Sequence, residues 1–493
     1  MKSKQVRSQA AAFSERGDWR KVAAAMVASG VLALPSAAFA RDDVQETLRK
    51  MNERLQQLEQ RNQALEKEVK TLRQTGTVAA APRVQPDNER LVRLERQNQV
   101  LQEQVRELAH APQPEPSVTE PGIEIGASLV SVYQHANRNG IASGETGHAG
   151  NYRGDVEISI PAGHWGEAQG KAFAHVRFGQ GNGLTLRDTH VGVPNSTTFE
   201  KYGGTNSDDS FAILAQAYYQ LTWPLKPTGF NDQPGDRIEL TLGKMDFFGF
   251  FDQNAVAGDE ASQFLNNAFV HNPLLDTGGD IGADNYGFAP GARLGYYNEG
   301  DGLLGWGVSL GIFAAGNGAR FDGRDNGGPL SVVQFELSPK QINGEPRGNY
   351  RIYAWNNGST EDLEGNRQRH RGWGISVDQR LGRDWNLFAR YGHRTSGEGA
   401  FDQALTGGFE FSGASWGRRH DAIGVGLGLL KTSQAQKLAS GIGGNERLAE
   451  IYYRGKINEH LEISPHYQWI SHPQGNSSVP DINVLGVRAA LSF

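Results

Sequence analysis

The chain has 493 residues, 63 glycines, no cysteine and a formal net charge of -6. The lack of cysteine excludes disulfides and thiolate metal sites, and so small a charge on a chain this long argues against a nucleic-acid binder. After residue 40 no segment approaches the roughly 20 consecutive apolar residues that a membrane helix needs, so a membrane role would require a β-barrel.

The first 40 residues predict a secretory signal peptide. A basic leader ends at Lys21, an apolar run covers residues 22–34, and residues 38–40 form a small-x-small cleavage site. The alternative is a membrane anchor, but the apolar run is short for a spanning helix and is interrupted by Gly30. We therefore expect export, with residues 1–40 removed.

Two heptad repeats follow the signal peptide. In residues 41–75 and 89–110 apolar residues recur at alternating steps of four and three, with Asn62 and Asn98 at core positions. Residues 76–88 and the proline-rich residues 111–121 are predicted linkers. Two short coiled coils are thus predicted to self-associate, the trimer being expected by analogy with large bacterial pores, and solvated helices packing on their own chain are the alternative. The residues expected to carry oligomerisation are Leu55, Leu58, Asn62, Leu65, Asn98 and Leu101.

From residue 122 to residue 493 the period changes to two. In the last ten residues Leu485, Val487 and Phe493 share one face of a strand, and Arg488 lies on the other. About 16 such alternating segments can be counted, an even number as single-chain bacterial barrels require. The predicted fold is all-β: an antiparallel outer-membrane barrel of about 16 strands, wide enough for an aqueous channel.

Alternation also predicts which side chains face the lumen. The basic set is Arg177, Arg237, Arg293, Arg351, Arg390, Arg454, Lys456 and Arg488. The acidic set is Asp155, Glu157, Glu239, Glu336, Asp378, Glu450 and Glu462, and the aromatic set is Tyr218, Tyr353, Trp355, Phe388 and Tyr452. Charges of both signs can pair with sugar hydroxyls, and aromatic faces can stack on sugar C–H faces. The alternative is that these charges only keep the lumen wet and the barrel rigid.

Two long segments interrupt the strand pattern. Residues 243–286 contain a predicted short helix at 259–269, with Phe264, Leu265, Ala268 and Phe269 on one side. We expect this segment to fold inward and narrow the channel, an external loop over the rim being the alternative. The polar, glycine-rich residues 179–210 are predicted to form an exposed loop.

The first of these segments carries a family resemblance. Residues 251–255, 259–260, 262–266 and 272–273 resemble the carbohydrate-selective porins of bacterial outer membranes, as do residues 350–355, 387–392 and 463–470. The resemblance covers nearly all of residues 122–493. It implies a 16-stranded barrel that admits glucose and related sugars by passive diffusion, with arginines and acidic residues at a constriction. The residues expected in the constriction loop are Asp252, Asn254, Asp259, Glu260, Phe264 and Asn266.

The amino-terminal extension is similar to that of trimeric porins that take dicarboxylates. A channel for small anions or dicarboxylates, using the inward arginines, is therefore one alternative function. Another is an envelope-spacing structural protein whose coiled coils lie in the periplasm and contact the cell wall, the pore being incidental. The expected partners are outer-membrane lipid and small sugars.

None of the enzyme-like motifs lies in the sequence context that its chemistry requires. Residues 307–311 and 413–417 match the nucleophile-elbow string, but neither is followed by a helix pattern. The histidines lack metal-ligand spacing. We expect a channel without catalysis, metal or cofactor.

Overall fold

The computed structural model describes the carboxyl-terminal part of the chain. The described residues are 122–138, 146–187, 189–199, 209–225, 236–276, 286–299, 303–315, 328–340 and 347–493. The predicted signal peptide, both coiled coils, both linkers and the six oligomerisation residues lie outside this part of the chain.

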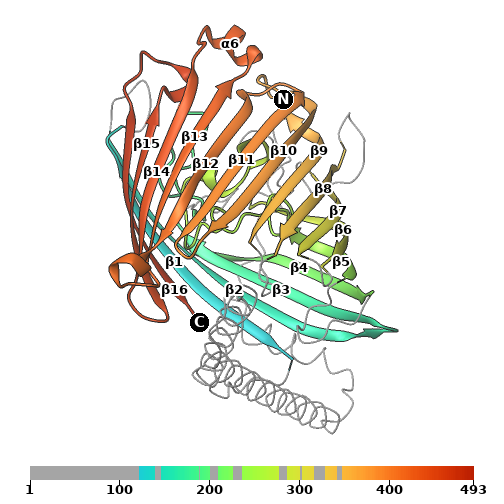
Figure 1. Ribbon diagram of the computed structural model, residues 1–493. Helices are drawn as coiled ribbons and strands as arrows, with labels where there is room; N and C mark the ends of the chain where they lie inside the picture. Colours follow the sequence, from blue (N-terminus) through green and yellow to red (C-terminus); the bar gives the residue numbers. More distant parts are fainter. Residues whose placement is uncertain are drawn as a thin grey trace, which may run out of the picture. The chain divides into compact units, whose positions relative to one another are not determined.

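Sixteen antiparallel strands close into a barrel in which β1 pairs with β16 (Figure 1). The strands are β1 (Glu124–Ala136), β2 (Gly147–Trp165), β3 (Ala168–Gln180), β4 (Phe211–Pro224), β5 (Asp236–Asp246), β6 (Phe288–Asn298), β7 (Leu304–Phe313), β8 (Leu330–Pro339), β9 (Gly348–Glu361), β10 (Arg367–Leu381), β11 (Trp385–Ser396), β12 (Phe401–Ser412), β13 (Ala422–Thr432), β14 (Asn445–Lys456), β15 (Leu461–Ser471) and β16 (Ile482–Ser492). The predicted all-β, 16-stranded barrel is confirmed.

The carboxyl-terminal residue completes the closure. Phe493 N–H donates to the carbonyl of Ala127 at 2.9 Å, and Ala127 N–H donates to the carbonyl of Phe493 at 3.2 Å. These bonds extend the β1–β16 ladder to the last residue, so they satisfy backbone groups that an open sheet edge would leave unpaired.

Alternation sorts the side chains of each strand onto two faces. In β16 Leu485 is 59% exposed on the outside, whereas Arg488 is 1% exposed on the inside. The outward rows of other strands likewise expose leucines, such as Leu405 and Leu427. An apolar outer face with a polar inner face is the arrangement of a barrel surrounded by lipid. Within the described residues no helix is long and apolar enough to cross a membrane.

The β5–β6 connection folds into the barrel, as predicted. It contains the one-turn helices α4 (Asn267–Val270) and α5 (Pro273–Asp276). The helix predicted at 259–269 is wrong: residues 259–263 form turns, and helical geometry begins only at Asn267. The reason is capping, because the Asn266 side chain accepts the N–H of Ala268 and so sets the helix start there.

The β3–β4 connection also folds inward, so the prediction of an exposed loop at 179–210 is wrong for its described residues 181–187 and 189–199. Leu184, Leu186, Val191 and Phe199 are buried. The first three join an apolar core inside the barrel together with Phe251, one of the phenylalanines of the β5–β6 connection. The loop folds inward despite its polar and glycine-rich composition, because burial of these few apolar side chains removes their surface from water.

Glycines on the inner face of β13 make room for this core. A Cβ at Gly426 would lie 3.0 Å from the rings of both Phe264 and Phe269. The interior of the barrel is therefore partly filled, rather than open across its whole width.

Candidate functional site

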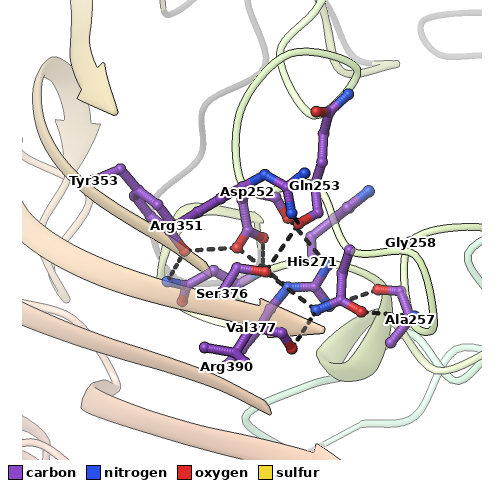
Figure 2. Close-up of polar contacts among 12 residues, drawn as sticks. Asp252, Gln253, Ala257, Gly258, His271, Arg351, Tyr353, Ser376, Val377 and Arg390 are labelled. Carbon is purple, nitrogen blue, oxygen red and sulfur yellow. Dashed lines mark hydrogen bonds and ion pairs between the residues drawn. The ribbon is translucent and has the colours of Figure 1, made fainter. Parts of the chain in front are cut away.

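A buried arginine and a buried aspartate hold the β5–β6 connection against the barrel wall (Figure 2). Arg390 of β11 donates to Asp252 Oδ1 at 3.2 Å and to the carbonyls of Ala257, Phe269 and Asp252. Asp252 has a left-handed backbone, with φ of 54°. Its carboxylate also accepts the Tyr353 hydroxyl and the N–H of Asn272, each at 2.7 Å. Each of these bonds joins the loop either to the barrel wall or to another part of the loop.

Inward side chains of β14 and β16 anchor the same loop. The Glu450 carboxylate of β14 accepts the N–H groups of Leu265 and Asn266, at 2.8 and 2.9 Å. Arg488 of β16 donates to the carbonyls of Glu260 and Gln263, at 3.0 and 2.7 Å. The loop is thus fixed at several points around the interior.

These contacts change the role of half of the predicted pore-lining residues. They project from the inner faces of their strands, but Tyr353, Trp355, Arg390, Glu450 and Arg488 lie beneath the loop, each at most 4% exposed. They anchor the loop instead of facing open lumen, because the loop covers the wall from which they project. In the loop itself, Asp252, Asn254, Phe264 and Asn266 are also buried, whereas Asp259 is exposed and Glu260 is partly exposed.

Most of the other predicted lumen charges form ion pairs, and Arg351 also donates to the Gln253 carbonyl of the loop at 2.9 Å. Asp155 contacts Arg153, His175 and Arg177 at 3.1, 2.7 and 2.6 Å. Arg153 also contacts Glu260 of the β5–β6 loop at 2.8 Å. Burial raises the pKa of Glu260, but the charges of Arg153 and Arg177 outweigh it and hold that pKa below its ordinary value.

A second paired group lies on β5 and β6. Glu239 contacts Arg237 at 2.6 Å and Arg293 at 2.9 Å, and Arg293 donates to the Tyr297 hydroxyl. On β9, Arg351 lies 3.2 Å from Asp378 and 3.5 Å from Glu336. Arg454 of β14 contacts Glu410 of β12 at 3.0 Å. Oppositely charged neighbours therefore cancel most of the field along this wall.

Two neighbouring cavities lie beside the loop. One, of about 350 Å³, is lined by the loop together with Asn349, Arg351 and Arg390. The other, of about 560 Å³, is lined by Arg177, Glu260 and residues of both inward loops. Both include Phe248 and His271, so this pair of side chains stands between them.

His271 is held in place on two sides. Its ring stacks on Phe248, with centroids 3.6 Å apart, and its Nδ1 lies 2.9 Å from Asp276 Oδ2. Burial lowers the pKa of His271, but Asp276, Glu260 and Asp246 outweigh that effect and raise the pKa above its ordinary value. The imidazolium is therefore favoured at this position.

An aromatic cluster also faces the lumen. Tyr218, predicted to point inward, stacks on Phe173 at 4.8 Å between centroids and meets the ring of Phe250 at 5.8 Å. Phe250 in turn lies under the Arg293 guanidinium at 4.9 Å. The predicted site did not include Phe173, Phe248, Phe250 or His271. The run of four phenylalanines at 247, 248, 250 and 251 was the available signal, since an exposed loop rarely carries so many.

The family model for the carbohydrate-selective porins of the OprB family matches residues 170–493. The chain belongs to this family. The porin is 23% identical to Porin B of Pseudomonas aeruginosa over 323 residues, covering 55% of this chain and 68% of that protein. Its fold is similar to the high-pH structure of Pseudomonas putida OprB, with a TM-score of 0.57 and 17% identity, over 76% of this chain and 94% of that one.

The porin is accordingly an outer-membrane β-barrel channel of a Gram-negative bacterium that passes carbohydrates. The nucleophile-elbow string at 307–311 lies within strand β7. A strand interior cannot provide the sharp strand-to-helix turn that the motif requires.

Proposed function

We propose that this porin admits neutral, glucose-type monosaccharides and small oligosaccharides by passive diffusion past His271 and Phe248. The supporting observation is the pairing of charges on the inner wall, at Asp155, Glu239 and Arg351. A ring of one sign would favour ions of the opposite sign, whereas paired signs favour neutral polar solutes. The proposed route comprises the two cavities of about 350 and 560 Å³.

The lining chemistry suits a sugar. Carboxylate and guanidinium groups that pair with each other still have free hydrogen-bonding positions, which can bond sugar hydroxyls. Hydrogen bonds to such charged groups are stronger than those between neutral groups. The Tyr218, Phe173 and Phe250 rings offer flat apolar surfaces for C–H faces. Among the residues predicted from sequence, we assign permeant contact to Arg177 and Arg351, which line the two cavities, and loop positioning to Arg390, Glu450 and Arg488.

Liposome swelling tests this function. Liposomes carrying the purified porin should swell in glucose, and a Tyr218→Ala variant should slow glucose entry relative to KCl conductance. An Ile160→Ala variant changes a residue on the outer face and serves as the matched control. Equal slowing in both variants, or no swelling with the unaltered porin, would contradict the assignment.

We further propose that residues 41–110 assemble the porin into a trimer through Leu55, Leu58, Leu65 and Leu101, and that this segment reaches the cell wall. Heptads with asparagine at core positions support self-association. Deleting residues 41–111 should leave glucose entry intact and lower the mass of the detergent-solubilised particle to that of one chain. Loss of envelope integrity with intact transport would assign this segment a spacing role.

A further inference from the structure

One end of the barrel has short connections between its strands. At this end residues 166–167 join β2 to β3, residues 382–384 join β10 to β11, and residues 457–460 join β14 to β15. The β3–β4 and β5–β6 connections, at the other end, are much longer. Bacterial outer-membrane barrels have their short turns on the periplasmic side, so the rim at this end lies in the phospholipid leaflet.

An aromatic row lies on the outer face of this rim. Trp385 of β11 lies directly opposite Phe411 of β12, with ring centroids 4.4 Å apart, and the ring of Trp416 lies 5.9 Å from that of Phe411. Trp385 and Trp416 are 43% and 38% exposed. Tryptophan prefers the depth of the lipid head groups, where its ring contacts apolar chains and its N–H contacts polar groups. The row therefore lies at the level of the head groups.

Three arginines stand next to this row, one in the β10–β11 turn and two in the β12–β13 turn. Arg383, Arg418 and Arg419 are all exposed. The two turns are adjacent, because Ser412 N–H donates to the Asp384 carbonyl at 2.8 Å. Neither turn has an exposed carboxylate, and within the described residues no ion pair involves Arg383 or Arg419. The rim thus carries positive charge that its own side chains leave unbalanced.

The middle arginine is held in a fixed position by its turn. Arg418 pairs through Nε with the buried Asp421 carboxylate, and its Nη2 donates to the Lys456 carbonyl at 2.9 Å. Gly417 has a left-handed φ of 80°, and Arg418 N–H donates to the Gly413 carbonyl at 2.9 Å. The Arg418 side chain is still 51% exposed, so part of the guanidinium remains open to a ligand.

We propose that this rim binds the head group of an anionic phospholipid, such as phosphatidylglycerol, in the periplasmic leaflet. The lipid phosphate accepts hydrogen bonds from Arg383, Arg418 and Arg419, since the planar guanidinium fork fits phosphate oxygens. The acyl chains lie along the Trp385 and Trp416 rings. The unbalanced positive charge favours a lipid with net negative charge over a zwitterionic one.

Tryptophan quenching by brominated phosphatidylglycerol tests this site. The full-length porin is reconstituted in phosphatidylcholine bilayers, and its preference is the association constant of brominated phosphatidylglycerol divided by that of brominated phosphatidylcholine. The difference between each porin and its Trp416→Phe counterpart isolates the quenching at Trp416. We expect Arg383→Gln and Arg419→Gln each to lower the preference roughly fivefold, the factor that one arginine near an anionic membrane surface contributes.

Arg447→Gln is the matched control, because Arg447 is an exposed arginine at the opposite end of the barrel, in β14. It should leave the preference unchanged, which separates a site at this rim from a general effect of one positive charge. Equal quenching of Trp416 by the two lipids in the unaltered porin would overturn the proposal. An equal loss of preference in Arg447→Gln and Arg383→Gln would do the same.

A second measurement does not depend on fluorescence. A ligand that binds only the folded porin stabilises it, so phosphatidylglycerol should raise the unfolding temperature of the detergent-solubilised porin more than phosphatidylcholine does. The rise should be smaller in Arg419→Gln, an exposed turn variant whose folding is checked by its heat-modifiable band on gels. An equal rise with both lipids would contradict the assignment.

Discussion

Arg390 and Asp252 form an ion pair inside the barrel, 3.2 Å apart, that joins strand β11 to the start of the inward β5–β6 loop. Both side chains are almost fully buried. Three loop carbonyls accept further hydrogen bonds from the guanidinium, and Tyr353 and Asn272 donate to the carboxylate. The pair therefore determines where the constriction lies.

Removing one partner should release the constriction. Arg390→Ala leaves Asp252 buried without its counter-ion, a change that typically costs about 3–5 kcal/mol. We expect a higher single-channel conductance and faster disaccharide entry, because the loop no longer stays on the wall. Arg380→Ala, at an exposed arginine of β10, is the control. Wild-type conductance in a folded Arg390→Ala porin would contradict this role.

A steric variant should displace the loop without changing charge. Gly392 lies two residues after Arg390, and a Cβ there would lie 2.4 Å from Asn272 Oδ1. Gly392→Val should destabilise the barrel by about 1–3 kcal/mol, the usual cost of overpacking. The readout is the temperature at which the heat-modifiable band unfolds on gels. Gly126→Val meets no atom within 4 Å of its Cβ and should leave that temperature nearly unchanged.

Ion selectivity should respond to single charges that line the cavities, such as Arg351. Arg351→Gln leaves Glu336 and Asp378 without their shared cation. Two unit charges about 4 Å apart in water interact with an energy of about 1 kcal/mol. Loss of the arginine charge should therefore raise the cation-to-anion permeability ratio roughly fivefold. The reversal potential in a KCl gradient measures this ratio. A shift toward anions would mean that Arg351 does not face the permeant.

His271 should make selectivity depend on pH. Its pKa is raised by Asp276, Glu260 and Asp246 against the effect of burial, so it stays charged to higher pH than a free histidine. As pH rises through this raised pKa, the constriction loses one positive charge and cation preference should increase. The folding stability that the imidazolium contributes is fully present below about pH 6.5, the ordinary pKa of histidine. It is lost as the pH rises through the raised pKa. His271→Gln should flatten the pH profile of the reversal potential, and an identical profile would refute the assignment.

Strand alternation alone predicted the barrel, because a membrane barrel imposes a strict period of two. It could not tell which inward residues remain open to solvent. Arg390 and Arg177 have the same sequence signature, yet Arg390 is 1% exposed and bonds loop carbonyls, whereas the Arg177 side chain is 17% exposed and pairs with Asp155. That difference depends on where two long connections pack, and such packing rests on contacts between residues far apart in the chain.

Packing between distant residues also explains why two sequence predictions were wrong. The helix expected at 259–269 gave way to turns because Asn266 caps a later helix. The β3–β4 loop was predicted to be exposed from its composition, whereas Val191 and Phe199 are buried in the interior.

The most direct test of the account is uptake by proteoliposomes carrying the purified porin, with glucose compared against a dicarboxylate of similar size. The paired charges at Asp155, Glu239 and Arg351 predict faster entry of glucose. Faster entry of the dicarboxylate would contradict the account and identify the arginines of the lumen as an anion-selective path.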